Sequence, residues 1–219
     1  MTERRTLAIL VSGSGSNLQA LLDAAAAPDF PARVGVVLSN VPGVLALERA
    51  RAAGVPSVVV PHQASPSRGA YDAALLEALA PYRPDVVCLA GFMRLVGGDF
   101  LRAFPLGVLN IHPALLPSFP GLHAVRQALD YGVKVSGCTV HLVDEGTDTG
   151  PVLAQAAVPV LASDTEATLA ARIQHEEHRL YPLAVRLVAS GAVLRTGRRV
   201  GGGAGPETSS LALFNPGFG

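Results

Sequence analysis

Short apolar runs alternate with segments of helical periodicity along the first half of the chain. The apolar runs, typical of buried strands, are 7–11, 34–38, 57–60, 86–90 and 108–111. The segments of helical spacing between them predict helices over 18–25, 44–53, 71–80 and 99–103. Near-continuous apolar strands separated by helices are typical of a parallel sheet that is covered on both faces. We therefore expect an α/β fold with a mostly parallel, twisted sheet.

The pattern changes in the second half of the chain. A helix is predicted over 122–131, and apolar runs at 133–143 and 152–160 follow with no helix between them. Consecutive strands joined by a short loop are antiparallel neighbours. We therefore expect these two strands to extend the parallel sheet in antiparallel fashion.

A long helix is predicted after residue 163. Ser163 and Glu166 form a capping-box pattern that would open it. Its expected buried stripe consists of apolar residues at helical spacing: Leu169, Ile173, Leu180, Ala184 and Leu187. Pro182 lies inside this helix and should kink it, because proline removes one backbone hydrogen bond. A last strand is predicted over 192–200.

The chain is predicted to form a single domain over residues 1–200. Its two halves, about 1–105 and about 106–200, are expected to pack closely around one core, which 219 residues are enough to build. Residues 201–219 begin with a glycine-rich segment and are expected to form a peripheral tail.

Composition excludes several classes of protein. Charged residues make up 16% of the chain and the net charge is zero, so neither nucleic acid nor a membrane surface is an expected partner. The apolar run 7–11 ends in Ser-Gly-Ser-Gly rather than a cleavage site, and no run approaches the length of a membrane span. Cys88 and Cys138 lie in apolar runs and are interpreted as small buried residues, not a disulfide. We expect a cytoplasmic protein.

Asn110 and His112 are the first candidate pair for chemistry. They stand two residues apart at the end of a predicted strand, so their side chains project from the same face. An amide donor beside an imidazole suits a carbonyl whose oxygen becomes negative during reaction. The alternative is a strand-end histidine that only binds the backbone of its own loop.

The turn after the first predicted strand is a second candidate. Gly15, Ser16 and Asn17 lie where backbone N–H groups and the helix dipole face an anion, which favours a single bound phosphate. The dinucleotide fingerprint would place a third glycine where this chain has Leu18, and it lacks the usual acid after the second strand, so NAD is disfavoured. The alternative is a glycine turn needed only for tight strand–helix packing.

The acid-rich loop 144–151 is a third candidate. One of its carboxylates could hold the imidazole of His112 in its protonated form, although such loops are most often solvated turns. No serine or cysteine is paired with a base, and no spacing of ligands suggests a metal. Direct transfer between two bound substrates is the chemistry that these groups favour.

Seven motifs together give the chain a family resemblance. The motifs are Ser12-Gly-Ser-Gly-Ser-Asn-Leu18, Ala90-Gly-Phe-Met-Arg-Leu95, Asn110-Ile-His-Pro-Ala-Leu-Leu-Pro117, Pro120-Gly-Leu-His123, Gly137-Cys-Thr-Val-His141, Asp148-Thr-Gly-Pro151 and Glu177-His-Arg-Leu-Tyr-Pro182. In this order they resemble the phosphoribosylglycinamide formyltransferase family of folate-dependent enzymes, over residues 6 to about 195. The resemblance implies a Rossmann-like first half that binds a ribonucleotide phosphate, and a second half that completes a folate pocket.

The resemblance also implies roles for individual residues. The implied catalytic residues are Asn110, His112 and Asp148. The implied ribonucleotide-binding residues are Gly15, Ser16, Asn17, Gln174 and Glu177. The implied folate-binding residues are Arg68, Met93, Arg94, Leu95, Val96, Asn110, Asp144, Glu145, Gly146, Thr147 and Asp148. Ala114 and Ser118 stand where many relatives have a serine and a basic residue, so substrate contacts there are in doubt.

The implied reaction transfers a formyl group from 10-formyltetrahydrofolate to the amine of glycinamide ribonucleotide, without a metal. The implied partners are these small molecules alone, and the protein is expected to be a monomer or a homodimer. A methionyl-tRNA formyltransferase should need a basic tRNA-binding domain. A formyltetrahydrofolate hydrolase should carry a further segment before the first strand. A nucleotide sensor without activity is the alternative from a different class.

Overall fold

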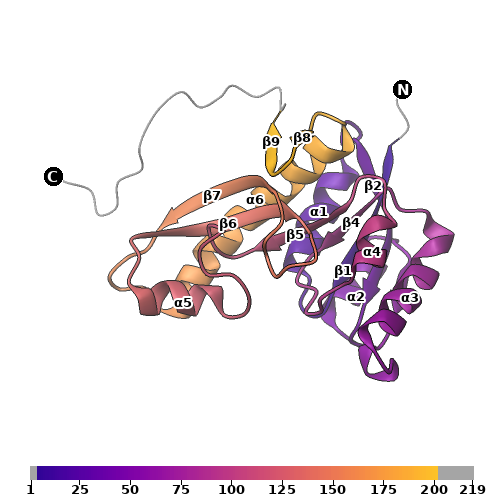
Figure 1. The fold of residues 1–219 in the computed structure, drawn as a ribbon, viewed down its shortest axis with the longest axis horizontal. Coiled ribbons are helices and arrows are strands. Elements are labelled where there is room, and N and C mark those ends of the chain that lie inside the picture. The colour runs from indigo at the N-terminus through magenta and orange to yellow at the C-terminus, as the bar shows by residue number, and fades with distance from the viewer. Residues whose placement is uncertain (1–3, 202–219) are drawn as a thin grey trace.

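The computed structural model describes residues 4–201, which form one seven-stranded sheet and a separate small hairpin (Figure 1). The order of strands in the large sheet is β3-β2-β1-β4-β5-β6-β7. The strands are β1 (Arg5–Val11), β2 (Ala32–Ser39), β3 (Ser57–Val59), β4 (Val86–Leu89), β5 (Val108–His112), β6 (Val135–Leu142) and β7 (Val152–Pro159). Strands β1 to β5 are parallel, whereas β6 and β7 are antiparallel. The predicted parallel sheet and its antiparallel extension are confirmed.

Helices cover both faces of the sheet. They are α1 (Ser16–Ala26), α2 (Leu45–Ala52), α3 (Arg68–Leu79), α4 (Gly98–Arg102), α5 (Ala124–Tyr131) and α6 (Glu166–Ala189), with short 3₁₀ turns at His62–Ala64 and Ala80–Tyr82. Alternate residues of β1 point to opposite faces: Leu7 and Ile9 join the core under α1 and α6, whereas Ala8 and Leu10 join the core under α3 and α4. Burial on both faces explains why the parallel strands are continuous apolar runs.

The chain reverses its direction of winding at β1. This strand pairs with β2 on one side and with β4 on the other, so the loops after β1 and β4 diverge to opposite faces. Ligands of open α/β sheets bind in the crevice that such a switch point creates at the carboxyl ends of the strands. The turn after β1, the loop after β4 and the end of β5 therefore meet at one edge of the sheet.

The prediction of a single last strand over 192–200 is wrong in detail. The structure has a hairpin of β8 (Leu194–Thr196) and β9 (Arg199–Gly201) instead, with Thr196 paired to Arg199. Gly197 has a φ of 61° in the two-residue turn, a conformation that suits glycine and reverses the chain. The tail predicted from residue 202 onward lies outside the described residues.

The start of α6 also differs from the prediction. Thr165, not Ser163, is the N-cap: its Oγ1 accepts a hydrogen bond from Thr168 N at 3.2 Å. Asp164 is held in the preceding turn, where its carboxylate accepts hydrogen bonds from Leu161 N and Arg172. Because Ser163 lies inside this turn, which runs from Leu161 to Asp164, the helix can begin only beyond it. The predicted stripe is buried except for Leu187, which is half-buried.

Helix α6 continues without interruption through Pro182. Tyr181 lies wholly buried beside it, with its hydroxyl 3.0 Å from Leu89 O and 3.1 Å from Leu109 O. This hydroxyl ties the helix to the last residue of β4 and the second residue of β5. Helix α5 begins at Ala124, two residues later than predicted, because His123 has a φ of 59°.

Cys88 in β4 and Cys138 in β6 are buried and unpaired, as predicted. Burial raises the pKa of each thiol to about 12. Within residues 4–201 no helix is long and apolar enough to cross a membrane, and no cluster of side chains has the composition of a metal site.

Candidate active site

Asn110 and His112 lie on β5, where β6 places polar side chains opposite them. The antiparallel register pairs Asn110 with His141 and His112 with Thr139. Facing positions of antiparallel strands bring side chains close together on one face. Two polar residues of β5 and two of β6 therefore share one patch of an otherwise apolar sheet.

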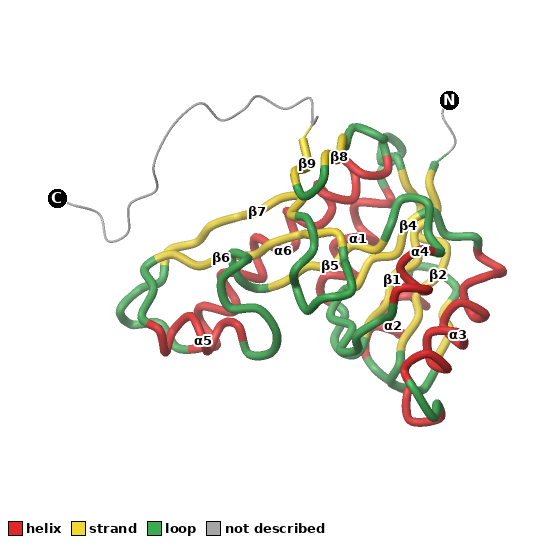
Figure 2. The backbone as a smooth tube through the Cα atoms, in the orientation of Figure 1, coloured by secondary structure: helices red, strands yellow, loops and turns green. Residues whose placement is uncertain are grey.

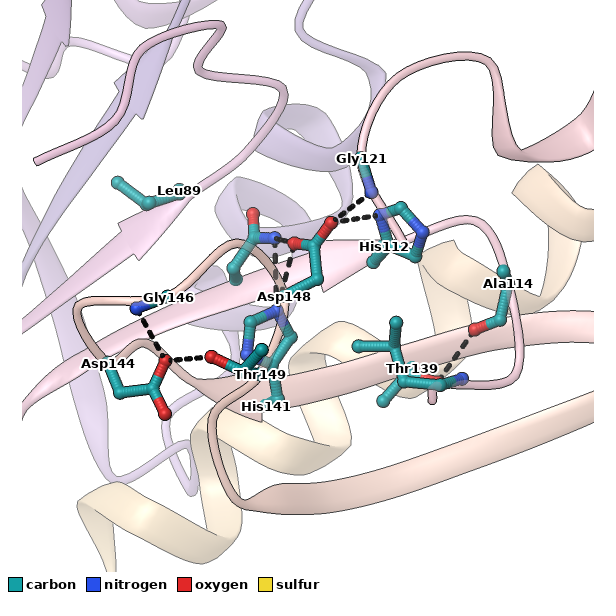
Figure 3. A network of polar contacts seen from close by, with 12 residues as sticks. Leu89, His112, Ala114, Gly121, Thr139, His141, Asp144, Gly146, Asp148 and Thr149 are labelled. Carbon is teal, nitrogen blue, oxygen red and sulfur yellow. Dashed lines mark hydrogen bonds and ion pairs between the residues drawn. The ribbon is translucent and has the colours of Figure 1, made fainter. Parts of the chain in front are cut away.

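Asp148 joins this patch from the loop between β6 and β7 (Figure 3). Its Oδ2 lies 3.3 Å from His112 Nδ1 and accepts a hydrogen bond from Gly121 N at 2.8 Å. Its Oδ1 lies 3.4 Å from Asn110 Nδ2 and 3.5 Å from His141 Nε2. The side chains of His112 and Asp148 are only 6% and 12% exposed. The structure thus brings together the three residues that the resemblance implied as catalytic.

The surroundings of Asp148 favour its ionised form. Burial alone would raise the pKa of this carboxyl, but the hydrogen bonds from His141 and Gly121 and the charge of His112 outweigh burial and lower it. The carboxylate therefore remains a fixed negative charge beside the imidazole of His112 across the physiological range of pH.

Both ring nitrogens of His112 face oxygen atoms. Nε2 lies 2.8 Å from the carbonyl oxygen of Phe119, which can only accept a hydrogen bond, so Nε2 must carry a proton. Nδ1 faces the carboxylate of Asp148, which also only accepts when ionised. The ring therefore donates through Nε2, and a proton on Nδ1 would lie against the carboxylate of Asp148.

His141 belongs to the cluster although it was not singled out from the sequence. Its Nδ1 donates to Leu142 O at 3.0 Å, and its Nε2 lies 3.2 Å from Asn110 Nδ2. It is almost wholly buried, at 1% exposure. The available signal was a histidine in the apolar run of β6 at the same alternation as Thr139, but the register that sets it against Asn110 is visible only in the fold.

A second polar cluster lies where α1 begins. Gly15 is the N-cap with a φ of 71°, and a Cβ there would lie 2.7 Å from that of Ala46, so only glycine fits. Gln174 of α6 donates to Ser16 Oγ at 3.0 Å, and Asn17 Nδ2 donates to Glu177 Oε2 at 2.8 Å. The five residues implied to bind the ribonucleotide therefore lie together, although they come from opposite ends of the chain.

This second cluster retains unused polar groups. The Oδ1 atom of Asn17 is buried without a hydrogen-bond partner, and so is Nε2 of the nearby His178 on α6. Glu177 is buried as well, which raises the pKa of its carboxyl, while the hydrogen bond from Asn17 opposes the rise. Unpaired buried polar atoms are costly in an isolated protein, so they favour a polar ligand here.

The loop after β4 is hydrogen-bonded to the turn after β1 and to α3. Met93 N donates to Ser12 Oγ at 2.8 Å, and Gly97 N donates to the buried carboxylate of Asp72 on α3 at 2.8 Å. The side chains of Met93 and Leu95 are 63% and 58% exposed. Val96 instead packs into the core under α3 and α4, so only its backbone could contact a ligand.

Two exposed arginines, Arg68 and Arg94, lie near the N-terminal turn of α3. Each acts electrostatically on a neighbouring residue of that turn, Arg68 on Asp72 and Arg94 on Tyr71. Arg68 and the loop after β4 therefore both lie near this end of α3.

The acid-rich loop lies beside α4. Glu145 Oε1 is 3.6 Å from Arg102 Nη1, and Asp144 Oδ1 accepts hydrogen bonds from Gly146 N at 3.1 Å and Thr149 Oγ1 at 2.6 Å. Thr147 is exposed in the same loop. The loop after β4 runs into α4, so the two stretches implied to bind folate lie next to each other.

The two departures from the family pattern lie in the loop after β5. The side chain of Ala114 is fully buried, and its carbonyl accepts a hydrogen bond from Thr139 Oγ1 at 2.7 Å (Figure 3). Ser118 is exposed. Position 114 therefore serves packing in this chain, whereas position 118 remains open to solvent.

Comparison with known proteins supports the arrangement. Residues 5–185 match the formyl transferase family model. A phosphoribosylglycinamide formyltransferase of Mycobacterium tuberculosis is 52% identical over 192 residues, which are 88% of each chain. The crystal structure of glycinamide ribonucleotide transformylase 1 from Symbiobacterium toebii has a TM-score of 0.89 and 55% identity, and the match covers 91% of this chain and 94% of that one.

Other relatives are much longer than this chain. The trifunctional purine biosynthetic protein adenosine-3 of Drosophila pseudoobscura is 52% identical over 88% of this chain, but the match spans only 14% of that protein. The match to residues 5–185 covers both halves of the seven-stranded sheet and both polar clusters. On the fold, the site and these matches, the chain belongs to the formyl transferase family.

Proposed function

We propose that this protein is a phosphoribosylglycinamide formyltransferase. It transfers the formyl group of 10-formyltetrahydrofolate to the amine of 5-phosphoribosylglycinamide, giving the N-formyl product and tetrahydrofolate in purine biosynthesis. The observation that carries the proposal is the buried cluster of Asn110, His112 and Asp148 at one end of β5. The N-terminus of α1 at Gly15–Asn17, which suits a phosphate, lies at the same edge of the sheet.

The catalytic cluster suits attack of an amine on a formyl carbon. The attack places negative charge on the formyl oxygen, and Asn110 Nδ2 and His112 Nε2 are the donors that could stabilise it once substrate replaces their present partners, Asp148 and Phe119 O. The contact between Asn110 Nδ2 and Asp148 is long at 3.4 Å, so this N–H can turn to a substrate oxygen at little cost. Removing one such donor typically lowers kcat by about 10²- to 10³-fold.

His112 also supplies the proton that the departing folate nitrogen requires. Its Nε2 proton is bound to Phe119 O at 2.8 Å, so substrate must replace this carbonyl before the proton can be transferred. The attacking amine loses a proton as the product forms, which restores the imidazolium in the overall balance. Asp148 stays ionised throughout and stabilises the charged ring.

The substrates are assigned to the two clusters of polar groups. Gly15, Ser16 and Asn17 hold the phosphate of the ribonucleotide, and Gln174 and Glu177 hold its ribose and glycinamide end. Folate lies between the loop after β4, with Arg68 and residues 93–96, and the loop 144–148. The partners are these small molecules, the formyl folate is consumed as a co-substrate, and the location is cytoplasmic.

The test is spectroscopic measurement of folate deformylation by purified protein without added metal. We expect turnover of 10-formyltetrahydrofolate only when glycinamide ribonucleotide is present. A matched reaction with ribose 5-phosphate tests whether the amine is required, because this compound has the phosphate but no acceptor. Equal turnover with water alone would instead support a hydrolase.

A further inference from the structure

The β8–β9 hairpin touches the loop that carries Asp148. Arg198, in the turn between the two strands, donates a hydrogen bond from its guanidinium to Thr149 O at 2.7 Å. Figure 2 shows β9 beside the start of β7, where this loop ends. A segment that follows all of the family motifs thus contacts the residue next to Asp148.

Thr149 is held from the opposite side as well. Its Oγ1 donates to Asp144 Oδ1 at 2.6 Å, and a Cβ on Gly146 would lie 2.0 Å from Thr149 Oγ1. The next residue, Gly150, lies so close to β6 that a Cβ there would be 1.7 Å from Leu142 O. The side chain of Thr149 is therefore fixed within the loop, and its carbonyl is fixed from outside by Arg198.

Asp148 needs such support because of its backbone conformation. Its φ is 54°, in the left-handed region that residues with a side chain adopt uncommonly, although aspartate adopts it more readily than most. In this conformation the carboxylate reaches His112 Nδ1 and Gly121 N together. The carbonyl that Arg198 holds lies one peptide beyond Asp148, and a shift there, passed on through Thr149, would move both oxygens of the carboxylate away from these partners.

We propose that Arg198 is a positioning residue for the formyl transfer. Through the carbonyl of Thr149 it holds Asp148 in the left-handed conformation that sets its carboxylate against His112. The proposal rests on the proposed function, because it gives Arg198 a role only if Asp148 serves catalysis. It assigns the C-terminal hairpin a part in the active site, although among the described residues no hydrogen bond or ion pair joins the hairpin to Asn110, His112 or Asp148.

The matched pair of variants is Arg198→Ala and Arg199→Ala. Arg199 is the next residue of the same hairpin, and its guanidinium forms no hydrogen bond or ion pair within residues 4–201. We expect Arg198→Ala to lower kcat about 3- to 10-fold, the effect of one lost hydrogen bond, with both KM values unchanged. Arg198→Lys should keep most of kcat, because an ammonium group can donate to the same carbonyl.

The pH profile separates positioning from a general loss of stability. The low pKa of Asp148 depends on its bonds to His141 and Gly121, so a loosened Asp148 becomes protonated at higher pH. The acid limb of the kcat profile should therefore move to higher pH in Arg198→Ala and stay in place in Arg199→Ala. Equal kcat and equal acid limbs in the two alanine variants would overturn the proposal, and so would a change confined to the KM for folate.

Asp148→Asn separates a failure of the proposed function from a failure of the role proposed for Arg198. If Asp148→Asn is as active as the unmodified protein, the proposed function fails at its centre. If Asp148→Asn is inactive and Arg198→Ala behaves like Arg199→Ala, only the role of Arg198 fails.

Discussion

Asp148 is the residue on which the polar contacts of the site converge. Its two oxygens engage His112, Gly121, Asn110 and His141, which come from two strands and one loop. A pairing of Asn110 with His112 is predictable, because residues two apart on a strand share a face. The residue pattern predicts that a carboxylate of the loop 144–151 could hold His112, and only the resemblance singles out Asp148. The pattern does not predict the place of His141, because both residues depend on how distant segments pair.

The charge of Asp148 should govern the pH dependence of turnover. Asp148→Asn removes an anion beside His112, so the protonated ring becomes less favoured at a given pH. We expect activity to fall on the order of 10²-fold or more at neutral pH, as for loss of a general acid, and to recover partly as the solution becomes more acidic. Rate profiles between pH 6 and 9 measure this, with Asp130→Asn on α5 as an exposed control. A loss that is the same at every pH would contradict the pairing.

Asp148 should also affect stability in acid. The pKa of its carboxyl is below the ordinary value of 3.8, so its ionised form stabilises the fold above that pH, and this contribution is lost as pH falls through the lowered pKa. We therefore expect the unmodified protein to have the larger free energy of unfolding near neutral pH, and its advantage over Asp148→Asn to shrink in acid. Urea unfolding at several pH values measures the difference. A constant difference down to the most acidic condition would exclude this role.

Asn17→Ala should weaken binding of the ribonucleotide much more than binding of folate. The change removes the donor to Glu177 Oε2 and the unused Oδ1 atom, both of which lie in the cluster at the start of α1. We expect roughly a tenfold loss of ribonucleotide affinity, the effect of one or two hydrogen bonds. Calorimetry with each substrate separately measures it. If only the affinity for folate fell, the assignment of this loop would be wrong.

At the scale of elements, strongly patterned segments were predictable and the ends of segments were not. Strands β1 and β4 are buried on both faces, so their apolar runs identify them without ambiguity. The region 192–200 carries too little apolar pattern to distinguish one strand from two short ones, and the turn depends on a single glycine at 197. The cap of α6 is not predictable from the sequence, because Ser163 and Thr165 both suit an N-cap and only the turn closed by Asp164 decides between them.

The cap of α6 can be tested with a matched pair of variants. Thr165→Ala removes the hydroxyl that accepts from Thr168 N, so the protein should lose about 1 kcal/mol of stability. Ser163→Ala changes the residue that the sequence pattern favoured, and it should change stability by less than about 0.5 kcal/mol. Denaturant unfolding measures both. A larger loss in Ser163→Ala would place the cap two residues earlier than the structure does.

At the scale of the whole molecule, one edge of the sheet gathers groups from the full length of the chain. Ser12 Oγ donates to Asn40 Oδ1 at 2.6 Å and accepts from Met93 N at 2.8 Å, so one hydroxyl joins the turns after β1, β2 and β4. Gln174 and Glu177 of α6 are hydrogen-bonded to the start of α1 at the same edge. The two proposed substrate sites are therefore parts of one connected set of loops.

The boundary of the active domain should lie at the end of β9. A truncation after Gly201 keeps the hairpin and every residue of the two clusters, so kcat and the unfolding midpoint should be unchanged. A truncation after Gly191 removes the hairpin and Arg198, and it should lower kcat as Arg198→Ala does. Activity and thermal unfolding of both forms measure this. A folded but inactive protein after truncation at Gly201 would show that the tail takes part in the chemistry.

The two buried thiols, the only cysteines of the chain, give the protein built-in reporters of its own motions. Alkylating reagents attack the thiolate, and with the pKa of both thiols raised to about 12, the closed sheet offers almost none. A thiol can therefore be modified only while its strand is locally unfolded, so the rate of modification measures how often the sheet opens. Cys88 reports from the parallel half and Cys138 from the antiparallel half. Equal labelling rates would mean that the halves open as one unit, and unequal rates that they open separately.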